Sequence, residues 1–587
     1  MTKDELIARL KGYEWTDFEC KRAQRDVPKD AYSTVSAFAN TQGGWLLFGV
    51  SESNGQLDVT GVDPTAFDRM QDAFLTTLRS GQKFNHVISA QPHVYELDGK
   101  RILAFYIPES SRHQKPIYLN GNPRDSFIRR AARDERMTDS ELQRFLRDAA
   151  QRSWDGEGVT DFSIDSSIDK ETLKWYQAQF YRRNDAQRPI DDPIEFLQEW
   201  NFIIHQEGNL VLTRAAIMLF GNDRCVRALL PRPVLDYQRI DTRFDRWAAD
   251  ERWHDRFVFE ENLFKTWQGL VAKYARIAEH PFNVDPATLR RNDDPPDYIA
   301  FREAAINLLI HQDYGDHHRK ASLKWFTDRL VFWNPGDAFA TTAQLLESNE
   351  KEIRNPLIVN AFRRIGLSDQ AGTGIRAILR NWHELGWRPP EINNDKAGKS
   401  FELVLRQEPL VTEAMKHFQT SLGVRLTSEQ ADVLALAADQ PSLSLVDAAM
   451  ATGGNLKAAH DALEYLRQHQ LLTPLGDDAF ALADLIRKRL DQHAAAVLTG
   501  EATPAPGTKL ALSRHQVEIL RKCLKENTLL ELMTVTGRSD RTKFRHQVLS
   551  PLLEAGLIEM TIPEKPRSSK QKYQLTSKGR HYLEESE

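Results

Sequence analysis

The sequence has few cysteines and no long apolar run. Its 587 residues include three cysteines, none of them in a C-x-x-C or C-x-x-H pair. This spacing excludes a disulfide framework or a zinc finger, and we expect the reducing cytosol as the compartment. No run of about 18 apolar residues is present to span a membrane, and the first residues lack the apolar core of a signal peptide. We therefore expect a cytoplasmic protein without a membrane partner.

The sequence also lacks a large net charge of either sign. It has 78 Lys and Arg against 83 Asp and Glu, a formal charge of −5, so its overall composition does not indicate a nucleic-acid-binding protein. Averaging over domains can hide a local basic surface, and residues 561–580 contain six Lys or Arg and one Glu. The 41% hydrophobic and 27% charged residues exclude a wholly disordered chain.

Length and changes in composition divide the chain into several domains. A domain typically has about 100–200 residues. Residues 499–507 are rich in Pro, Gly and small polar residues, which is typical of a linker. A helix capped by Thr138 should end near Ala150 and close the first domain. We predict a multidomain α+β and α/β protein with the divisions 1–150, 151–295, 296–408, 409–490, 491–510 (linker) and 511–587.

Carboxylates and a lysine gather around the first two expected strands. Alternation predicts that Glu19 and Lys21 lie on one face of a strand. Glu14 matches neither a helix face nor a strand face with Glu19, so it should lie in the preceding turn. The apolar run 45–50 predicts a strand buried on both faces, and Glu52 follows its expected end. Any one of these carboxylates is also compatible with an ordinary solvated side chain.

Three sequence segments carry a first family resemblance. The segment TVSAFANTQGGWLLFGVSE, preceded by E-x4-E-x-K and followed by SFIRR at 126–130, resembles the Schlafen-type AlbA domain. Nucleases of that family use three carboxylates and a divalent metal to cut RNA, notably transfer RNA. The resemblance implies Glu14, Glu19 and Glu52 as catalytic residues and as ligands of Mg²⁺ or Mn²⁺. The family more often has Asp at the third position, and Glu52 reaches one methylene further.

The chemistry implied by this resemblance is coherent. Carboxylate oxygens suit hard cations, and such an ion can lower the pKa of a bound water and neutralise charge on a scissile phosphate. Lys21 would stabilise the charge that develops on the phosphorane. Arg129 and Arg130 would bind the phosphate backbone of the nucleic acid.

A later helix places three polar side chains on one face. In the segment 301–311, Glu303, Asn307 and His311 follow one another at intervals of four residues, so they share a helix face. A carboxylate and an amide oxygen one turn apart can together hold a water molecule and Mg²⁺.

Motifs after this helix complete an ordered series. A hairpin is predicted at 322–333, and Asn334-Pro-Gly336 ends its second strand. Arg354-Asn355-Pro356 follows, and then Gly372-Thr373-Gly374 opens a helix whose N–H groups can bind phosphate. The series resembles the GHKL ATPase domain, an α/β sandwich, in its variant RecG-related C-terminal form. The chain has no G-x4-G-K-[ST] loop, so helicase activity is not indicated.

This second resemblance implies roles for individual residues. Glu303 would be the general base for the attacking water and Asn307 the Mg²⁺ ligand, while residues 340–355 would form a lid. The family has Asp where this chain has Asn334, so the hydrogen bond to the adenine amino group would be neutral and weaker. The implied ATP-binding residues are Asn307, His311, Asn334, Gly336, Gly372, Thr373 and Gly374.

Two C-terminal segments have the order helix–helix–helix–hairpin, which predicts winged helices at 409–490 and 511–587. A basic recognition helix followed by a basic wing is typical of binding to duplex DNA. Winged helices also serve as dimerisation or docking modules, and the third helix of the first copy is barely basic. The predicted nucleic-acid-binding residues of the second copy are Arg538, Arg541, Lys543, Arg545, Lys565, Arg567, Lys570 and Lys572.

Together these features predict an ATP-regulated, metal-dependent nuclease and ATPase that acts on RNA or single-stranded nucleic acid as a homo-oligomer. A prokaryotic defence or stress role would follow from the family resemblance alone. The alternative is a non-cleaving transcriptional regulator that binds DNA and responds to ATP. A third possibility is a scaffold in which both sites are vestigial, so that neither metal nor ATP would change its melting temperature.

Overall fold

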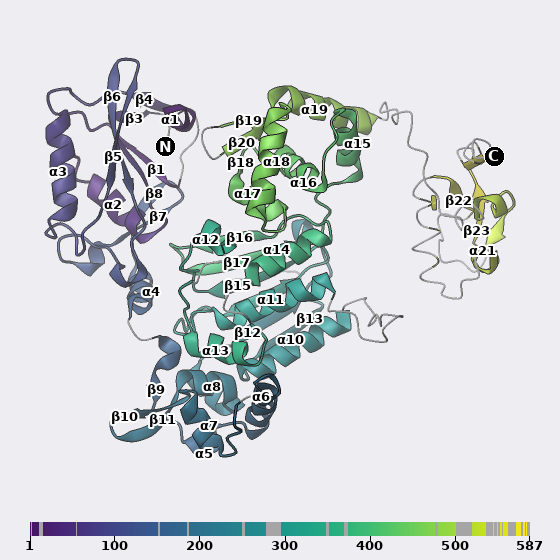
Figure 1. The fold of residues 1–587 in the computed structure, drawn as a ribbon, viewed down its shortest axis with the longest axis horizontal. Helices are drawn as coiled ribbons and strands as arrows, with labels where there is room; N and C mark the ends of the chain where they lie inside the picture. The colour runs from purple at the N-terminus through teal and green to yellow at the C-terminus, as the bar shows by residue number, and fades with distance from the viewer. Residues whose placement is uncertain are drawn as a thin grey trace. The chain divides into compact units, whose positions relative to one another are not determined.

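The computed structural model divides the chain into two compact units, Met1–Ala496 and Val497–Glu587, and the division falls inside the predicted linker 491–510. Figure 1 shows the fold. The structure describes all residues except 2, 11–15, 54–55, 151–152, 185–186, 249–252, 278–294, 348–350, 369–373, 476–478, 500–518, 536–543, 545–548, 550–551, 554–555, 562–570, 577–578, 581–582 and 584–587.

Residues 1–150, here called the N-terminal domain, contain a four-stranded sheet of order β1-β2-β6-β5. Its first two strands are parallel and joined through helix α2, and the other pairs are antiparallel. Phe38 of α2 and Phe48 of β2 are fully buried in the core on one face of this sheet. The bounds are α1 (Lys3–Leu10), β1 (Phe18–Lys21), α2 (Ala31–Asn40), β2 (Gly44–Phe48), α3 (Phe67–Arg79), β5 (Gln91–Leu97) and β6 (Lys100–Ile107).

The expected strand 45–50 is two strands in the structure. β2 ends at Phe48, and β3 (Val50–Ser53) begins a hairpin with β4 (Gln56–Val59). Gly49 lies between them at φ +90°, a backbone conformation that favours glycine. Glu52 therefore follows the end of the apolar strand β2, as predicted, but it lies within a further strand, β3, that the sequence did not indicate.

A second hairpin and a capped helix complete the N-terminal domain. The hairpin pairs β7 (Phe127–Arg130) with β8 (Arg133–Arg136). Helix α4 (Asp139–Ala149) begins at Thr138, whose hydroxyl accepts from the N–H of Glu141 while the Glu141 carboxylate accepts from the N–H of Thr138. This confirms the predicted helix start at Thr138 and its end near Ala150.

Residues 151–230 are mainly helical and carry a small three-stranded sheet of order β10-β11-β9. Thr213 caps one of these helices, since its hydroxyl accepts from the N–H of Ala216, and the helix stops before Gly221. The bounds are β9 (Gly158–Val159), α5 (Ile164–Ser167), α6 (Lys170–Arg183), α7 (Pro193–Glu199), β10 (Ile203–Gln206), β11 (Asn209–Thr213), α8 (Arg214–Phe220) and α9 (Asp223–Leu229).

The largest sheet has the order β13-β12-β14-β15-β17-β16. Its central hairpin, β14 with β15, is the hairpin expected from the sequence, and β15 ends within Asn334-Pro-Gly336. Two of its strands, β12 and β13, come from before residue 296, where the sequence had suggested a connecting region. The bounds are β12 (Leu235–Arg239), β13 (Asp255–Phe259), β14 (Ala321–Trp325), β15 (Arg329–Pro335), β16 (Glu391–Asp395) and β17 (Ser400–Arg406).

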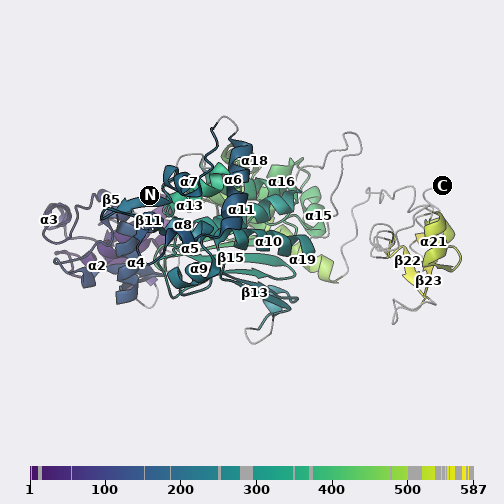
Figure 2. The same ribbon diagram turned by 90° about the horizontal axis from the view of Figure 1, so that it is seen from below.

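Helices cover one face of this sheet. Figure 2 shows α10 and α11 on the same side of the strands, and α14 packs beside α11. One continuous buried core runs from Leu173 to Leu405, so residues on both sides of 296 share it. The bounds are α10 (Leu263–Ile277), α11 (Pro296–Ile310), α12 (Thr342–Leu346), α13 (Pro356–Arg364) and α14 (Gly374–Glu384).

The last part of the first unit contains the predicted three helices and hairpin at 428–482, and a further helix lies on either side of them. It has the sheet order β18-β20-β19 and its own core, which includes Leu346 and Leu379 from the preceding domain. The bounds are α15 (Glu413–Ser421), α16 (Ser428–Asp439), β18 (Leu443–Ser444), α17 (Leu445–Ala451), α18 (Leu456–Gln468), β19 (Leu472–Pro474), β20 (Ala479–Leu482) and α19 (Asp484–Thr499), which extends into the predicted linker.

The second unit is described in part. It contains the three-stranded sheet β21-β23-β22 with α21 (Leu529–Val535) and a separate core around Leu532 and Tyr573. The strand bounds are β21 (Asn527–Thr528), β22 (Ile558–Met560) and β23 (Lys572–Leu575). In neither unit does a helix within the described residues reach the length and apolarity that crossing a membrane requires.

Candidate active site and ATP-binding cavity

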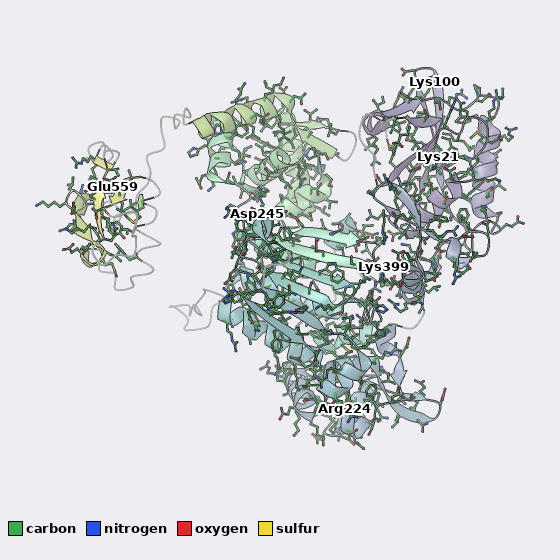
Figure 3. All side chains as sticks on the ribbon, turned by 180° about the vertical axis from the view of Figure 1, so that it is seen from behind. Lys21, Lys100, Arg224, Asp245, Lys399 and Glu559 are labelled. Carbon is green, nitrogen blue, oxygen red and sulfur yellow. The ribbon has the colours of Figure 1, made fainter. Side chains whose placement is uncertain are left out.

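Glu19 and Lys21 lie on β1 as predicted and are joined by an ion pair. Lys21 Nζ lies 2.8 Å from Glu19 Oε1 and 2.8 Å from Asp30 Oδ2. Burial lowers the pKa of Lys21, but the hydrogen bonds that its ammonium donates to the Asp30 and Glu19 carboxylates outweigh this effect, so the net shift of the pKa is upward. The ammonium is therefore fully charged at neutral pH, as charge stabilisation at a phosphate requires. Figure 3 labels Lys21 within the N-terminal domain.

Arg129 occupies the other oxygen of Glu19. Its Nη1 lies 2.9 Å from Glu19 Oε2 and 2.9 Å from Asp134 Oδ1, and its side chain is 3% exposed. Its Nε and Nη2 donate to the carbonyl oxygens of Thr16 and Phe18 at 3.2 and 3.1 Å. Arg129 thus ties β7 to the start of β1 from inside the domain.

Arg130, by contrast, is 43% exposed and reaches two carboxylates of its own domain. Its guanidinium donates to Glu141 at the start of α4 and to Glu135 of β8 at 3.4 Å. The contact of Arg130 with nucleic acid stays a prediction. Arg129, by contrast, is buried, so its contacts within the domain give it a structural role.

Glu52 belongs to the same neighbourhood as Glu19. Burial raises the pKa of the Cys20 thiol, and the negative charges of Glu19 and Glu52 raise it further. Both carboxylates therefore lie within electrostatic reach of one side chain. Within the described residues, no three His, Cys, Asp or Glu side chains are grouped as metal ligands, and Glu14 lies outside those residues. The three-carboxylate metal site stays a prediction.

The donor set at this place still suits a divalent cation. A carboxylate has about four acceptor positions, and two of those on Glu19 are used by Lys21 and Arg129. Glu19 and Glu52 offer only oxygen atoms, the ligands that Mg²⁺ and Mn²⁺ prefer.

Five of the seven predicted ATP-binding residues, together with the predicted general base Glu303, line one cavity of about 160 Å³ in the domain built on the largest sheet, and this cavity is here called the first cavity. Its apolar surface comes from residues such as Leu308 and Phe401, as expected for a site that holds a base. Two further predicted residues, Gly372 and Thr373, lie outside the described residues. The six are Glu303, Asn307, His311, Asn334, Gly336 and Gly374.

Glu303 and Asn307 meet the start of α14. A Cβ placed on Gly374 would lie 3.3 Å from Asn307 Nδ2 and 3.4 Å from Glu303 Oε2. Only a residue without a side chain keeps the space between the helices open there. Glu303 is 15% exposed, and Arg302 Nη2 lies 3.2 Å from its Oε1. The carboxylate and the amide thus face the helix end that the sequence assigns to phosphate.

The end of β15 forms another wall of the first cavity. Asn334 is buried, and its amide nitrogen donates to the carbonyl oxygens of Pro335 and Gly336 at 3.1 and 3.3 Å. Gly336 has φ +100°, and a Cβ there would lie 2.9 Å from Arg354 Nε. Glycine is required at this position both by the backbone conformation and by the close approach of Arg354.

His311 lines the first cavity as a neutral ring. Burial lowers its pKa to about 4, and the charge of Arg354 lowers it as well. At neutral pH the ring can therefore donate through one nitrogen and accept through the other. This suits hydrogen bonding to a nucleotide and not charge pairing with it.

A buried charge network connects the first cavity to α4. Arg354, which lines the cavity, pairs with Asp148 and lies 3.1 Å from Asp337 Oδ1. Lys399 Nζ lies 3.2 Å from Asp148 Oδ2 and 3.3 Å from Asp337 Oδ1. Figure 3 labels Lys399, which lies in the turn between β16 and β17 of the large sheet. Two cations thus share two carboxylates, one from each domain.

Other contacts reinforce this junction. Arg147 pairs with Asp313 at 2.9 Å and Arg144 with Asp316 at 3.1 Å. In the predicted lid, Glu352 pairs with Arg112 of the N-terminal domain. Sequence reasoning missed the roles of Asp148 and Asp337. The available signal was a carboxylate directly after Asn334-Pro-Gly336, in an otherwise buried segment.

Most of the predicted nucleic-acid-binding residues of the second unit cannot be placed. Lys572 is on β23, and its Nζ lies 3.3 Å from Glu526 Oε2. The other seven lie outside the described residues: Arg538, Arg541, Lys543, Arg545, Lys565, Arg567 and Lys570.

One known family matches the N-terminal domain. Residues 14–138 match the family "Schlafen, AlbA_2". The N-terminal domain is similar to this Schlafen family. From here it is called the Schlafen-type domain, and the predicted resemblance is confirmed.

Three further families match other parts of the chain. Residues 318–405 match "Putative ATP-dependent DNA helicase recG C-terminal", which confirms the second predicted resemblance. Residues 143–236 match a domain of unknown function, and residues 515–576 match "Filamentation induced by cAMP protein Fic-like, C-terminal domain". The Schlafen and RecG-related matches together indicate an ATP-dependent protein that acts on nucleic acid.

The solved structures that match the chain include the following two. The DIP2311 protein from Corynebacterium diphtheriae is 20% identical over 95% of this chain and 94% of its own, with a TM-score of 0.37. The N-terminal domain of a RecG-related protein from Nitrosomonas europaea is 32% identical over 23% of this chain and 90% of its own, with a TM-score of 0.18. No curated protein matches the chain.

Proposed function

We propose that this protein is a metal-dependent nuclease whose Schlafen-type domain is controlled by ATP bound in the first cavity. The observation that supports it best is the ion pair between Arg354, in the cavity wall, and Asp148, in the last turn of α4. A change in the cavity wall acts directly on the domain that carries the acidic cluster.

In the Schlafen-type domain, Glu19 and Glu52 would hold the divalent cation. When bound, that cation supplies an activated water and charge neutralisation at the scissile phosphate. Lys21 keeps its proton because two carboxylates raise its pKa, so it can stabilise negative charge as the phosphate is attacked. Arg129 fixes the position of Glu19 through the 2.9 Å contact with Oε2.

In the first cavity, Glu303 would orient and deprotonate the water that attacks the nucleotide. Asn307, one helix turn away, would supply an amide oxygen for Mg²⁺. Asn334 and Gly336 would contact the base at the end of β15. Gly374 leaves room for phosphate at the start of α14, because the first backbone N–H groups of a helix have no acceptor within it and can bind an anion.

The lid connects nucleotide binding to the Schlafen-type domain. Its described residues Glu352 and Arg354 line the first cavity and pair with Arg112 and Asp148 across the domain junction. The ring of Phe339 also lines the cavity, with the guanidinium groups of Arg112 and Arg354 at 4.8 and 4.5 Å from its centre. A ligand that moves this segment must rearrange contacts of both domains.

The direct experiment compares cleavage by the wild type and Glu19→Gln. Single-stranded RNA and transfer RNA are incubated with the full chain, Mn²⁺ and ATP, and the products are separated by length. We expect cleavage by the wild type and its loss in Glu19→Gln. Glu96→Gln, which changes an exposed carboxylate of the same domain, should cleave like the wild type. Cleavage that persists in Glu19→Gln contradicts the assignment.

One observation favours a second function, a nucleotide-responsive DNA-binding regulator that does not cleave. Both carboxylate oxygens of Glu19 are already paired with cations, as in a structural ion-pair network. If this alternative holds, the protein binds a specific DNA duplex with an affinity that changes when ATP is added, and neither Glu19→Gln nor Glu52→Gln changes that affinity. Binding measurements without added metal separate it from the nuclease.

A further inference from the structure

A second, larger cavity lies next to the first in the same unit. Its volume is about 950 Å³, and Glu303 lines both cavities. Helices α11 and α14 form one side of this second cavity, and the turn between α17 and α18 forms the other. None of the predicted nucleic-acid-binding residues belongs to it.

The two sides of the second cavity are packed firmly together. Gly453 and Gly454, at φ +69° and +83°, form the turn before α18. A Cβ on Gly453 would lie 3.3 Å from Arg380 Cα, and one on Gly454 would lie 3.4 Å from Leu379 Cδ1. His383 Nε2 lies 2.9 Å from Asp432 Oδ2 of α16. The cavity is therefore a fixed feature of two domains in contact.

The lining of the second cavity is rich in cations. It contains Arg302, Arg376, Arg380 and Lys457, against the carboxylates of Glu303 and Glu347. Arg302 is paired with Glu303. In the part of the chain that the structure describes, no ion pair joins the other three cations to a carboxylate. They leave a net positive surface that an anion would neutralise.

Two details point to an anionic ligand near Arg376. Its Nε is buried and has no hydrogen-bond partner among the described residues. Burial lowers the pKa of Lys351, a residue of the first cavity, and repulsion from Arg376 lowers it further. The positive charges of Arg376 and Lys351 at the boundary between the cavities therefore repel each other, and a bound anion would reduce this repulsion.

The start of α18 adds partial positive charge. Asn455 caps this 13-residue helix by accepting from the N–H of Ala458 at 3.0 Å. The N–H groups of Leu456 and Lys457, in the first turn, have no acceptor within the helix. Both residues line the cavity, where the helix dipole favours an anion.

We propose that the second cavity binds the sugar–phosphate backbone of a single nucleic-acid strand, through Arg376 and Arg380 on α14 and Lys457 on α18. The proposal rests on the proposed function only in that the protein acts on nucleic acid. Arg376 and Arg380 are one turn apart, about 6 Å along the axis, which allows them to contact neighbouring phosphates. The strand would thus lie directly beside the nucleotide.

The lining favours a strand over the phosphates of the nucleotide itself. The volume of about 950 Å³ far exceeds that of the first cavity, about 160 Å³. Arg380 and Lys457 are exposed, so the cationic surface continues outward. Among the described residues that line the cavity none is aromatic, which favours backbone contacts over base stacking and hence little sequence preference.

The test measures binding of fluorescein-labelled oligo(dT) and oligo(U) to the full chain by fluorescence anisotropy, with EDTA present so that no cleavage occurs. The variants are Arg380→Glu, Lys457→Glu and the double variant. Lys457→Glu should fold normally, because an acidic residue in the first helix turn is favourable. The control is Lys416→Glu with Arg467→Glu, which changes the charge equally at exposed positions of the domain that carries Lys457.

We expect at least about tenfold weaker binding by the double variant. Its plot of log affinity against log salt should be shallower by about 1.4, since each lost phosphate contact on a single strand contributes about 0.7. The control should bind like the wild type, and MgATP affinity should change little. A wild type that binds neither oligonucleotide contradicts the proposed function as well. Equal oligonucleotide binding by the wild type and the double variant overturns this inference alone. A double variant that loses affinity for MgATP but not for the oligonucleotides also overturns it, because the cavity would then bind the phosphates of the nucleotide.

Discussion

Arg354 in the wall of the first cavity pairs with Asp148 at the end of the Schlafen-type domain, although the two residues are 206 positions apart in the sequence. Their side chains are 10% and 5% exposed. Lys399 and Asp337 complete the network, so that each carboxylate contacts both cations. Through these four side chains, the RecG-related domain and the Schlafen-type domain share one buried cluster of charges.

Replacing Asp148 by Asn should destabilise the first unit and uncouple its domains. The variant leaves Arg354 and Lys399 with Asp337 as their shared carboxylate. Breaking a buried pair in this way costs about 3 kcal/mol. We expect a lower melting temperature of the first unit and cleavage that no longer responds to ATP. Thermal unfolding and cleavage rates with and without ATP measure both effects.

Asp139→Asn is the matched control for this change. Asp139 is on the same helix, α4, but its side chain is 75% exposed. Exposed substitutions of this kind change stability by about 0.5 kcal/mol or less. Equal melting temperatures for the two variants would contradict a stabilising role for the Asp148 network.

The same pair predicts a dependence of stability on acid. Burial raises the pKa of Asp148, but Arg354 and Lys399 outweigh it, and the pKa falls to about 2. In the unfolded chain the pKa is about 3.9. Because the folded pKa is the lower one, the stabilisation is complete above about pH 5 and is lost as the pH falls from about 4 towards 2.

This is measured as the difference in melting temperature between the wild type and Asp148→Asn across pH. The difference should stay constant between about pH 7 and 5 and shrink below about pH 4. If the difference in melting temperature already shrinks between neutral pH and pH 5, a group other than Asp148 causes the pH dependence.

Glu303→Gln should separate nucleotide turnover from nucleotide binding. Loss of a general base lowers a rate by about 10²–10⁴-fold, while the amide keeps the shape of the side chain between α11 and α14. We expect ATP affinity within a few-fold of the wild type and hydrolysis reduced at least a hundredfold, about the lower bound for such a group. Glu384→Gln, an exposed carboxylate on α14, serves as the control. Unchanged hydrolysis in Glu303→Gln would remove Glu303 from that role.

Arg129→Lys should lower stability more than it changes nucleic-acid binding. A lysine cannot reproduce the contacts of the guanidinium with Glu19, Asp134 and two carbonyl oxygens. We expect a loss of about 2 kcal/mol, in the range for breaking a buried hydrogen-bond network. Arg133→Lys, at an exposed position of the next strand, should be neutral. Weaker RNA binding by Arg129→Lys with unchanged stability would support the phosphate role instead.

Periodicity and motif order were sufficient to predict much of the candidate ATP site. The spacing of Glu303, Asn307 and His311 placed them on one face of α11, and the structure has all three in the wall of the first cavity. Asn334 and Gly336 line it because the hairpin ends where Asn334-Pro-Gly336 indicates. Such local rules apply because each motif sets the geometry of its own element.

Long-range pairings could not be predicted in this way. Nothing near Asp148 in the sequence indicates that it meets Arg354, and nothing near Arg129 indicates that it is buried against Glu19. An isolated charged residue has the same appearance in a sequence whether it contacts solvent or a distant partner. Likewise, β12 and β13 belong to the large sheet, although the sequence pattern around them did not indicate that they pair with its later strands.

The most direct test of the central claim is the rate of RNA cleavage in Mn²⁺, measured with and without ATP for the wild type, Asp148→Asn and Glu19→Gln. The account predicts that ATP changes the wild-type rate several-fold, that Asp148→Asn still cleaves but ignores ATP, and that Glu19→Gln does not cleave. An RNA that stays intact with the wild type under both conditions, or a rate in Asp148→Asn that still follows ATP, would contradict it.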